Sequence, residues 1–269
     1  MTVESALKSA AYECMGAKIA YRRGGAGPTM LFLRSGDALP HDEAFIQALT
    51  RHYDVIVPDL PGFGASDTPE WFRSVGDLAN FCLELITALD LQHTHVAGAS
   101  TGGWVAAETA IRDCSRMASL TLLAPLGVRA TGKTFGDPFL MKPGDDLRAR
   151  FFDKTFADDF LNRQHSKEEG AAILKDKYAL ARIGWAPRFH NPELQRWLHR
   201  IRCPIQLIWG EDDIIAPPAM AQAWLEAIPG AKLETISHCG HLPHIEQREQ
   251  TLALLSRFTA ANSGQRASG

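Results

Sequence analysis

The first residue of this sequence that could do chemistry is Ser100, which lies in the run Gly98-Ala99-Ser100-Thr101-Gly102. An apolar stretch of strand length precedes it, and an Ala-rich stretch of helical character follows. The pattern therefore predicts a strand, a sharp turn and a helix, the arrangement called a nucleophile elbow. Such a turn needs residues almost without side chains two positions before and after the serine, and glycine meets that need. The alternative is a buried serine in a glycine-rich turn.

A base and an acid follow Ser100 in the order that a Ser-His-acid triad on such a sheet requires. A serine hydroxyl is a weak nucleophile until a base takes its proton, and a third group must orient that base. Asp213 follows the predicted buried strand 204–209, and His241 follows the next strand, 232–236. Because open α/β sheets place their sites at the carboxyl ends of strands, we expect Ser100, Asp213 and His241 to meet there.

Neighbouring side chains could in principle take the place of the acid, the base or the nucleophile, but for each of them we expect a role outside the reaction. Glu211 and Asp212 are expected to be solvated or helix-facing charges, and His238 and His244 to be loop or cap-facing histidines. Cys239 lies beside the candidate base but on no elbow, so we expect a spectator thiol.

The rest of the chain alternates strands and helices, which predicts a parallel α/β sheet. Besides the strand that ends at the elbow, the predicted strands are 18–23, 29–33, 54–58, 119–124, 204–209 and 232–236. The predicted helices are 42–51, 77–89, the elbow helix to about residue 112, 218–228 and a last helix to about residue 259. The polar tail 260–269 is expected to be disordered.

The alternation stops between residues 127 and 196, where aromatic side chains lie among charges in helical stretches without a strand. We expect a helical cap over one sheet edge, with ordinary surface helices as the alternative. The predicted division is a discontinuous core, 1–126 and 197–269, and a cap, 127–196.

Composition limits the class of protein and its partners. The chain has 269 residues, 45% hydrophobic and 22% charged, with a net charge of −3, so neither nucleic acid nor an anionic membrane is an expected partner. No apolar run approaches the roughly 18 residues of a membrane span, and residues 1–11 lack the features of a secretory signal.

Five cysteines without C-x-x-C spacing indicate free thiols and a cytoplasmic location. No metal or cofactor motif appears, so the only expected partner is a small-molecule substrate. The sequence does not indicate an oligomeric state.

Four motifs resemble those of the α/β-hydrolase superfamily and follow its order over nearly the whole chain. They are residues 58–66, the elbow, the acid turn Gly210-Glu211-Asp212-Asp213 and the histidine loop 240–246. The resemblance implies an α/β fold with a mostly parallel eight-stranded sheet flanked by helices, and a helical cap inserted after the sixth strand. It also implies that Ser100, Asp213 and His241 form the triad and that the backbone N–H groups of Gly36 and Thr101 bind the oxyanion. Some relatives place the acid after the sixth strand, where this chain has no carboxylate.

The chain departs from the superfamily in the loop after the strand 29–33. Arg34-Ser35 stands where relatives usually have His-Gly. Arg34 has two interpretations: it pairs with a nearby carboxylate such as Asp37 or Asp59, or its guanidinium holds an anionic group of the substrate.

Three functions are open at this point. The first is hydrolysis of a small carboxylic ester through an acyl-enzyme. The second is cleavage of a carbon–carbon bond, as in the meta-cleavage-product hydrolases, which carry a Gly-rich oxyanion loop and usually an aromatic residue after the histidine; this chain has Leu242 there. The third is ligand binding with slow turnover, which only the altered loop supports.

Overall fold

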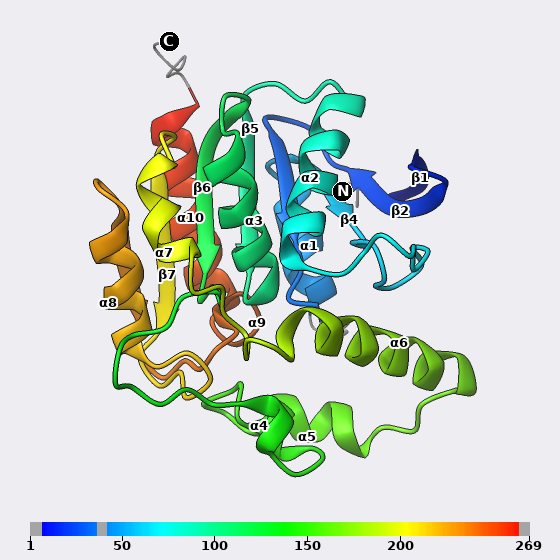
Figure 1. Ribbon diagram of the computed structural model, residues 1–269, viewed down its shortest axis with the longest axis vertical. Coiled ribbons are helices and arrows are strands. Elements are labelled where there is room, and N and C mark those ends of the chain that lie inside the picture. The colour runs from blue at the N-terminus through cyan, green and yellow to red at the C-terminus, as the bar shows by residue number, and fades with distance from the viewer. Residues whose placement is uncertain (1–6, 37–41, 264–269) are drawn as a thin grey trace.

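Eight strands form one sheet in the computed structural model, which describes residues 7–36 and 42–263. Their order across the sheet is β1-β2-β4-β3-β5-β6-β7-β8; β2 is antiparallel to β1 and to β4, and the other neighbours are parallel (Figure 1). The strands are β1 (Lys8–Cys14), β2 (Ala17–Gly24), β3 (Thr29–Leu33), β4 (Asp54–Pro58), β5 (Thr94–Ala99), β6 (Met117–Leu123), β7 (Ile205–Gly210) and β8 (Lys232–Ile236). The mostly parallel α/β fold expected from the sequence is confirmed.

Alternating side chains of the central strands supply two hydrophobic cores, one on each face of the sheet. Met30 and Phe32 of β3 pack with helix α1 (Asp42–Leu49) and with Leu255 of α10 (Arg248–Asn262). Leu31 and Leu33 of the same strand belong to the core on the other face. Successive side chains of a buried strand therefore belong to the cores on opposite faces of the sheet.

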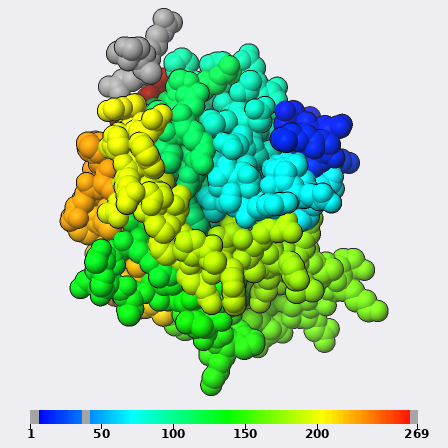
Figure 2. Space-filling view, viewed as in Figure 1, coloured from blue at the N-terminus to red at the C-terminus, as the bar shows by residue number. Residues whose placement is uncertain are grey.

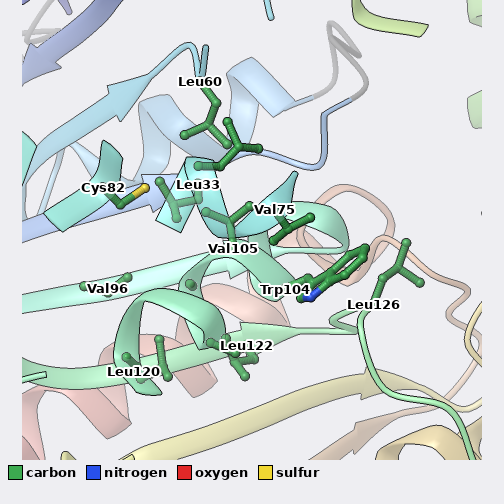
Figure 3. Close-up of a cluster of buried hydrophobic side chains, with 14 of the residues drawn as sticks. Leu33, Leu60, Val75, Cys82, Val96, Trp104, Val105, Leu120, Leu122 and Leu126 are labelled. Carbon is green, nitrogen blue, oxygen red and sulfur yellow. The ribbon is translucent and has the colours of Figure 1, made fainter. Parts of the chain in front are cut away.

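The second face is covered by helices α2 (Val75–Ala88), α3 (Thr101–Arg112) and α8 (Pro218–Ala227). Figure 3 shows Leu33, Val96 and Leu122 of the strands in one cluster with side chains of α2 and α3, among them Cys82 and Val105. The indole of Trp104, on α3, lies beside Leu126, in the segment that leaves β6. This packing fixes the helix that begins directly after Ser100.

The chain between β6 and β7 is helical, and most of it lies across the end of the sheet toward which β6 points (Figure 1). Figure 2 shows this segment as a green to yellow-green layer over that end. It contains α4 (Asp145–Arg148), α5 (Thr155–Asn162), α6 (Lys167–Gly184) and α7 (Leu194–Trp197), with short 3₁₀ turns at Pro138–Leu140 and Leu198–Arg200. Helix α7 crosses residue 196, where the sequence placed the return to the core, and Leu194 and Leu198 belong to the main core.

Polar contacts fasten α6 to the loop after β4. Lys175 Nζ donates to the carbonyl of Gly64 at 2.8 Å, and Asp176 Oδ1 accepts the Gly64 N–H at 2.8 Å. Arg182 donates to the carbonyl of Phe72, also at 2.8 Å. Helix α6 is therefore held at both its middle and its end against the loop between β4 and α2.

Two sequence predictions about the chain ends need correction. Strand β1 was not predicted, because its side chains are mostly exposed and show no apolar alternation. The last helix is two helices, α9 (Pro243–Glu246) and α10, and Ala260–Asn262, expected in a disordered tail, close α10. Residues 1–6 and 264–269, to which the remaining predictions about the ends refer, lie outside the described residues. None of the described helices is long and apolar enough to cross a membrane.

Candidate active site

Ser100 occupies a strained turn between β5 and α3. Its backbone angles, φ 53° and ψ −117°, lie outside the regions that a residue with a side chain normally adopts. A Cβ on Gly98 would overlap the carbonyl of Gly102, and a Cβ on Gly102 would overlap the carbonyl oxygens of Leu33 and Arg34. The glycines on both sides of the serine are therefore required by close backbone approach.

Ser100, His241 and Asp213 form one hydrogen-bonded chain. Ser100 Oγ lies 2.8 Å from His241 Nε2, and His241 Nδ1 lies 2.8 Å from Asp213 Oδ2. All three residues are buried. Because a carboxylate can only accept, Nδ1 carries a proton and Nε2 of the neutral ring is left to accept the serine hydroxyl proton. The structure thus brings together the three residues that the sequence nominated.

The turn after β7 holds the Asp213 carboxylate in place. Its Oδ1 accepts the N–H groups of Ile215 at 2.9 Å and Ala216 at 2.8 Å, which leaves Oδ2 for the histidine. Asp212 and Glu211 are exposed, and Glu211 accepts a hydrogen bond from Thr235, as expected for solvated charges.

The cap segment contacts the histidine loop directly. The backbone N–H of His241 donates to the carbonyl of Arg150 at 2.7 Å. Glu246 accepts the N–H of Gly240 at 2.7 Å and those of Phe152 at 3.1 Å and Asp153 at 2.5 Å. The sequence assigned no individual role to Glu246, which ties residues 152–153 of the cap to the loop that carries His241.

Gly36 lies next to Thr101, the residue that follows the serine. Gly36 has a φ of +77°, and a Cβ there would meet Thr101 Oγ1 at 2.8 Å and the Phe63 ring at 3.3 Å. The Thr101 hydroxyl donates to the carbonyl of Ser35 and so fixes the loop that contains Gly36. As the first residue of α3, Thr101 has a backbone N–H without an intrahelical acceptor.

Arg34 is paired with carboxylates, the first of its two interpretations. Its Nε lies 3.1 Å from Asp42 Oδ2, and one terminal nitrogen lies 3.7 Å from Asp59 Oδ1. The sequence named Asp59 and Asp37 as partners; Asp42 was missed, and Asp37 lies outside the described residues. An anionic substrate group would have to compete with two carboxylates for this guanidinium.

Three other residues in or beside the histidine loop, His238, Cys239 and His244, differ in their exposure and contacts. His238 is exposed, and its ring lies 5.3 Å from that of Phe152, so it faces the cap as expected. The same expectation for His244 is wrong: this residue is fully buried, with Nε2 3.0 Å from Asp42 Oδ1. Burial raises the pKa of the Cys239 thiol, which keeps it protonated and unreactive.

Both apolar and charged side chains line the space beside Gly36. A Cβ on Gly36 would lie 3.7 Å from Leu180 of α6. A cavity of about 20 Å³, the size of one water, is lined there by Leu60 and Phe63 and also by the charged residues Arg34, Asp59 and Asp176. No group of three or more His, Cys, Asp or Glu side chains that could hold a metal ion occurs among the described residues.

Comparison with known proteins identifies the family of this chain. The model of the Alpha/beta hydrolase family matches residues 25–254, so the chain belongs to that family and is an enzyme of the α/β-hydrolase type. It is 26% identical to an uncharacterised protein of Mycobacterium tuberculosis, covering 90% of this chain and 78% of that one. It is also 26% identical to the 2-hydroxy-6-oxo-2,4-heptadienoate hydrolase of Pseudomonas putida, covering 88% and 91%. The crystal structure of a bacterial membrane phospholipase A superposes with a TM-score of 0.79 at 23% identity, covering 96% of this chain and 87% of that chain.

Proposed function

We propose that this protein hydrolyses a small carboxylic ester through an acyl-enzyme in which Ser100 is the nucleophile. The observation that carries the proposal is the unbroken chain from Asp213 through His241 to Ser100, with both hydrogen bonds at 2.8 Å. A serine presented on a strained turn at a helix N-terminus, with its base already in contact, is suited to attack an acyl carbon.

In the first half of the reaction, Ser100 Oγ attacks the ester carbonyl carbon while His241 Nε2 takes the hydroxyl proton. The carbonyl oxygen becomes an oxyanion, which the N–H groups of Gly36 and Thr101 stabilise. When the intermediate collapses, the bond to the leaving oxygen breaks and His241 returns the proton to that oxygen. An alcohol departs, and the acyl group remains on Ser100.

In the second half, water replaces the alcohol. His241 takes a proton from the water as its oxygen attacks the acyl carbon, and the same two N–H groups stabilise the second oxyanion. Collapse expels Ser100 Oγ, which regains the proton from His241, and the carboxylic acid leaves. Asp213 stays ionised and stabilises the imidazolium that forms in each half.

The surroundings of the site support a small, uncharged acyl group. Phe63 and Leu180 contribute apolar surface beside Gly36, and Arg34 is matched by Asp42 and Asp59 rather than left available to an anion. The substrate is the only partner we propose. The five cysteines are free, which fits the reducing cytoplasm that the sequence predicts.

Cleavage of a carbon–carbon bond is the second candidate, supported by the similarity to the Pseudomonas putida hydrolase. Against it stand the loop Arg34-Ser35-Gly36 and Leu242 after the histidine, since the meta-cleavage-product hydrolases that the chain resembles have a Gly-rich loop and usually an aromatic residue there.

Steady-state kinetics on matched substrates separate these candidates. p-Nitrophenyl acetate, butyrate and octanoate would be compared with a 2-hydroxy-6-oxo-dienoate, whose cleavage is followed by loss of its absorbance. We expect the butyrate to give the highest kcat/KM, with a burst of p-nitrophenol equal to the enzyme concentration if deacylation is slower than acylation. A kcat/KM for the dienoate at least tenfold above every ester would replace the ester proposal with the second candidate. Slow turnover of all four would support the ligand-binding alternative.

A further inference from the structure

A buried carboxylate joins the two loops that flank the reacting serine. Each oxygen of Asp42 is bound by a different segment: Oδ1 lies 3.0 Å from His244 Nε2, and Oδ2 lies 3.1 Å from Arg34 Nε. Asp42 and His244 are 1% and 0% exposed. Arg34 and His244 are 210 positions apart in the chain, and both bind Asp42.

The network is costly to bury unless its geometry is maintained. An ionised carboxylate removed from water needs partners for its oxygens. Burial alone raises the pKa of Asp42, but the hydrogen bonds from His244 and Arg34 and the positive charge of Arg34 outweigh burial and lower the pKa below its usual value. Asp42 is therefore ionised at neutral pH, and both partners are held to it by charge-assisted hydrogen bonds.

One end of the network belongs to the loop that carries Gly36. Arg34 is the first residue after β3, two positions before Gly36. The carbonyl oxygens of Leu33 and Arg34 press against Gly102 so closely that a Cβ there would overlap them. Moving Arg34 would therefore shift Gly36 relative to the helix that begins with Thr101.

The other end belongs to the loop that carries His241. His244 is three residues further along, in the short helix α9. Its ring meets the rings of Phe32 and Phe45 edge-on, with centroids 6.0 and 5.4 Å away. Held between these rings and Asp42, His244 leaves α9 little freedom to shift or rotate.

We propose that Asp42 is a positioning residue that fixes the Gly36 N–H relative to His241 by binding Arg34 and His244 at once. This inference rests on the proposed function, because it assigns Gly36 to the oxyanion and His241 to proton transfer. The two groups serve the same tetrahedral intermediate, and a misplacement of about 1 Å can cost about 100-fold in rate. The network sets their separation without contacting the substrate.

The test compares Asp42→Asn with Glu108→Gln, a matched loss of one buried carboxylate. Glu108 is also buried and also hydrogen-bonded to an arginine, Arg112, but it contacts neither loop. Both variants and the wild type would be titrated with a fluorophosphonate to count working sites, and kcat and KM for p-nitrophenyl butyrate would be normalised to that count. His244→Gln, which keeps a side-chain donor but not the ring, is the second variant.

We expect Asp42→Asn to lower kcat about 10- to 100-fold with KM changed less than about threefold, because a transition-state interaction is lost while substrate contacts stay. His244→Gln should lower kcat in the same direction, and Glu108→Gln should keep the wild-type value. If Asp42→Asn does not fold, His244→Gln decides alone.

Other results of these measurements would overturn either the inference about Asp42 alone or the proposed function as well. Wild-type kcat per titrated site in Asp42→Asn or, failing that, in His244→Gln would overturn the inference while leaving the proposed function intact. An equal loss in Glu108→Gln would overturn it too, since any buried charge would then have the same effect. A wild type that neither reacts with the fluorophosphonate nor turns over the ester would overturn the proposed function, and the inference with it.

Discussion

Ser100 Oγ and His241 Nε2 lie 2.8 Å apart although 141 positions separate the two residues in the chain. The contact forms because β5 and β8 are parallel strands of one sheet, so that the turns after them open at the same edge. The strained backbone at Ser100 aims the hydroxyl into that edge, and the Arg150 carbonyl holds the His241 backbone there. The following predictions depend on this pairing and on the groups that maintain it.

Asp213→Asn tests the orienting role of the acid. An amide at this position can present a donor to His241 Nδ1 and so favour the wrong tautomer, and we expect kcat to fall about 10⁴-fold. The control is Asp212→Asn, one position away and exposed, which should stay within about twofold of the wild type. Turnover of p-nitrophenyl butyrate by both variants is the measurement; equal losses would contradict the assignment of Asp213.

Gly36→Ala tests the proposed oxyanion loop. The new Cβ would lie 2.8 Å from Thr101 Oγ1, so the loop must shift, and we expect kcat to fall about 100-fold. Gly16→Ala is a matched control, because Gly16 has the same φ of +77° but nothing within 4 Å. Both variants should lose about 1–2 kcal/mol of stability from left-handed backbone strain. A similar loss of kcat in Gly16→Ala would show that strain, not the loop, limits turnover.

The buried carboxylate of Asp42 should make stability depend on pH in acid. Its folded-state pKa is lowered, so its stabilising contribution is complete above the unfolded-state pKa of about 3.9 and is lost as the pH falls through the lower folded value. Urea unfolding of the wild type and Asp42→Asn should differ most at pH 6, and the difference should shrink below about pH 4. A difference that grew as the pH fell would have the wrong sign for this account.

Thiol reactivity should single out Cys114. A hydrogen bond with Cys203 lowers the pKa of the partly exposed Cys114 thiol to about 6, whereas burial raises the pKa of Cys82 to about 12. Iodoacetamide at pH 7.5 should therefore modify Cys114 first, as located by peptide mass spectrometry, with hydrolysis retained. Rapid modification of Cys239 with loss of turnover would contradict its role as a spectator.

Much of the site was predictable because its parts follow strand ends. Ser100, Asp213 and His241 each come after a buried strand, and parallel strands bring such turns to one edge whatever their distance along the chain. The glycines around Ser100 gave a second signal, since only close backbone approach explains them. Short continuous apolar runs predicted the central strands equally well, because a parallel strand is buried on both faces of its sheet.

Other features of the fold and the site could not be predicted from the residues near them in the sequence. Strand β1 is exposed and has no apolar pattern, so only its pairing with β2 defines it. The contact of Asp42 with His244 spans 202 positions, and nothing in either segment marks one as the partner of the other. The prediction for His244 was wrong because a histidine in a loop usually faces solvent, whereas this one is buried against the rings of Phe32 and Phe45.

The most direct test of the central claim is the intact mass of the protein after reaction with a fluorophosphonate, beside the Ser100→Ala variant. The account predicts one adduct per wild-type chain, located by peptide mapping on the peptide that contains Ser100, and none on Ser100→Ala under the same conditions. An unmodified wild type, or an adduct that persists in Ser100→Ala, would contradict the claim that Ser100 is the nucleophile.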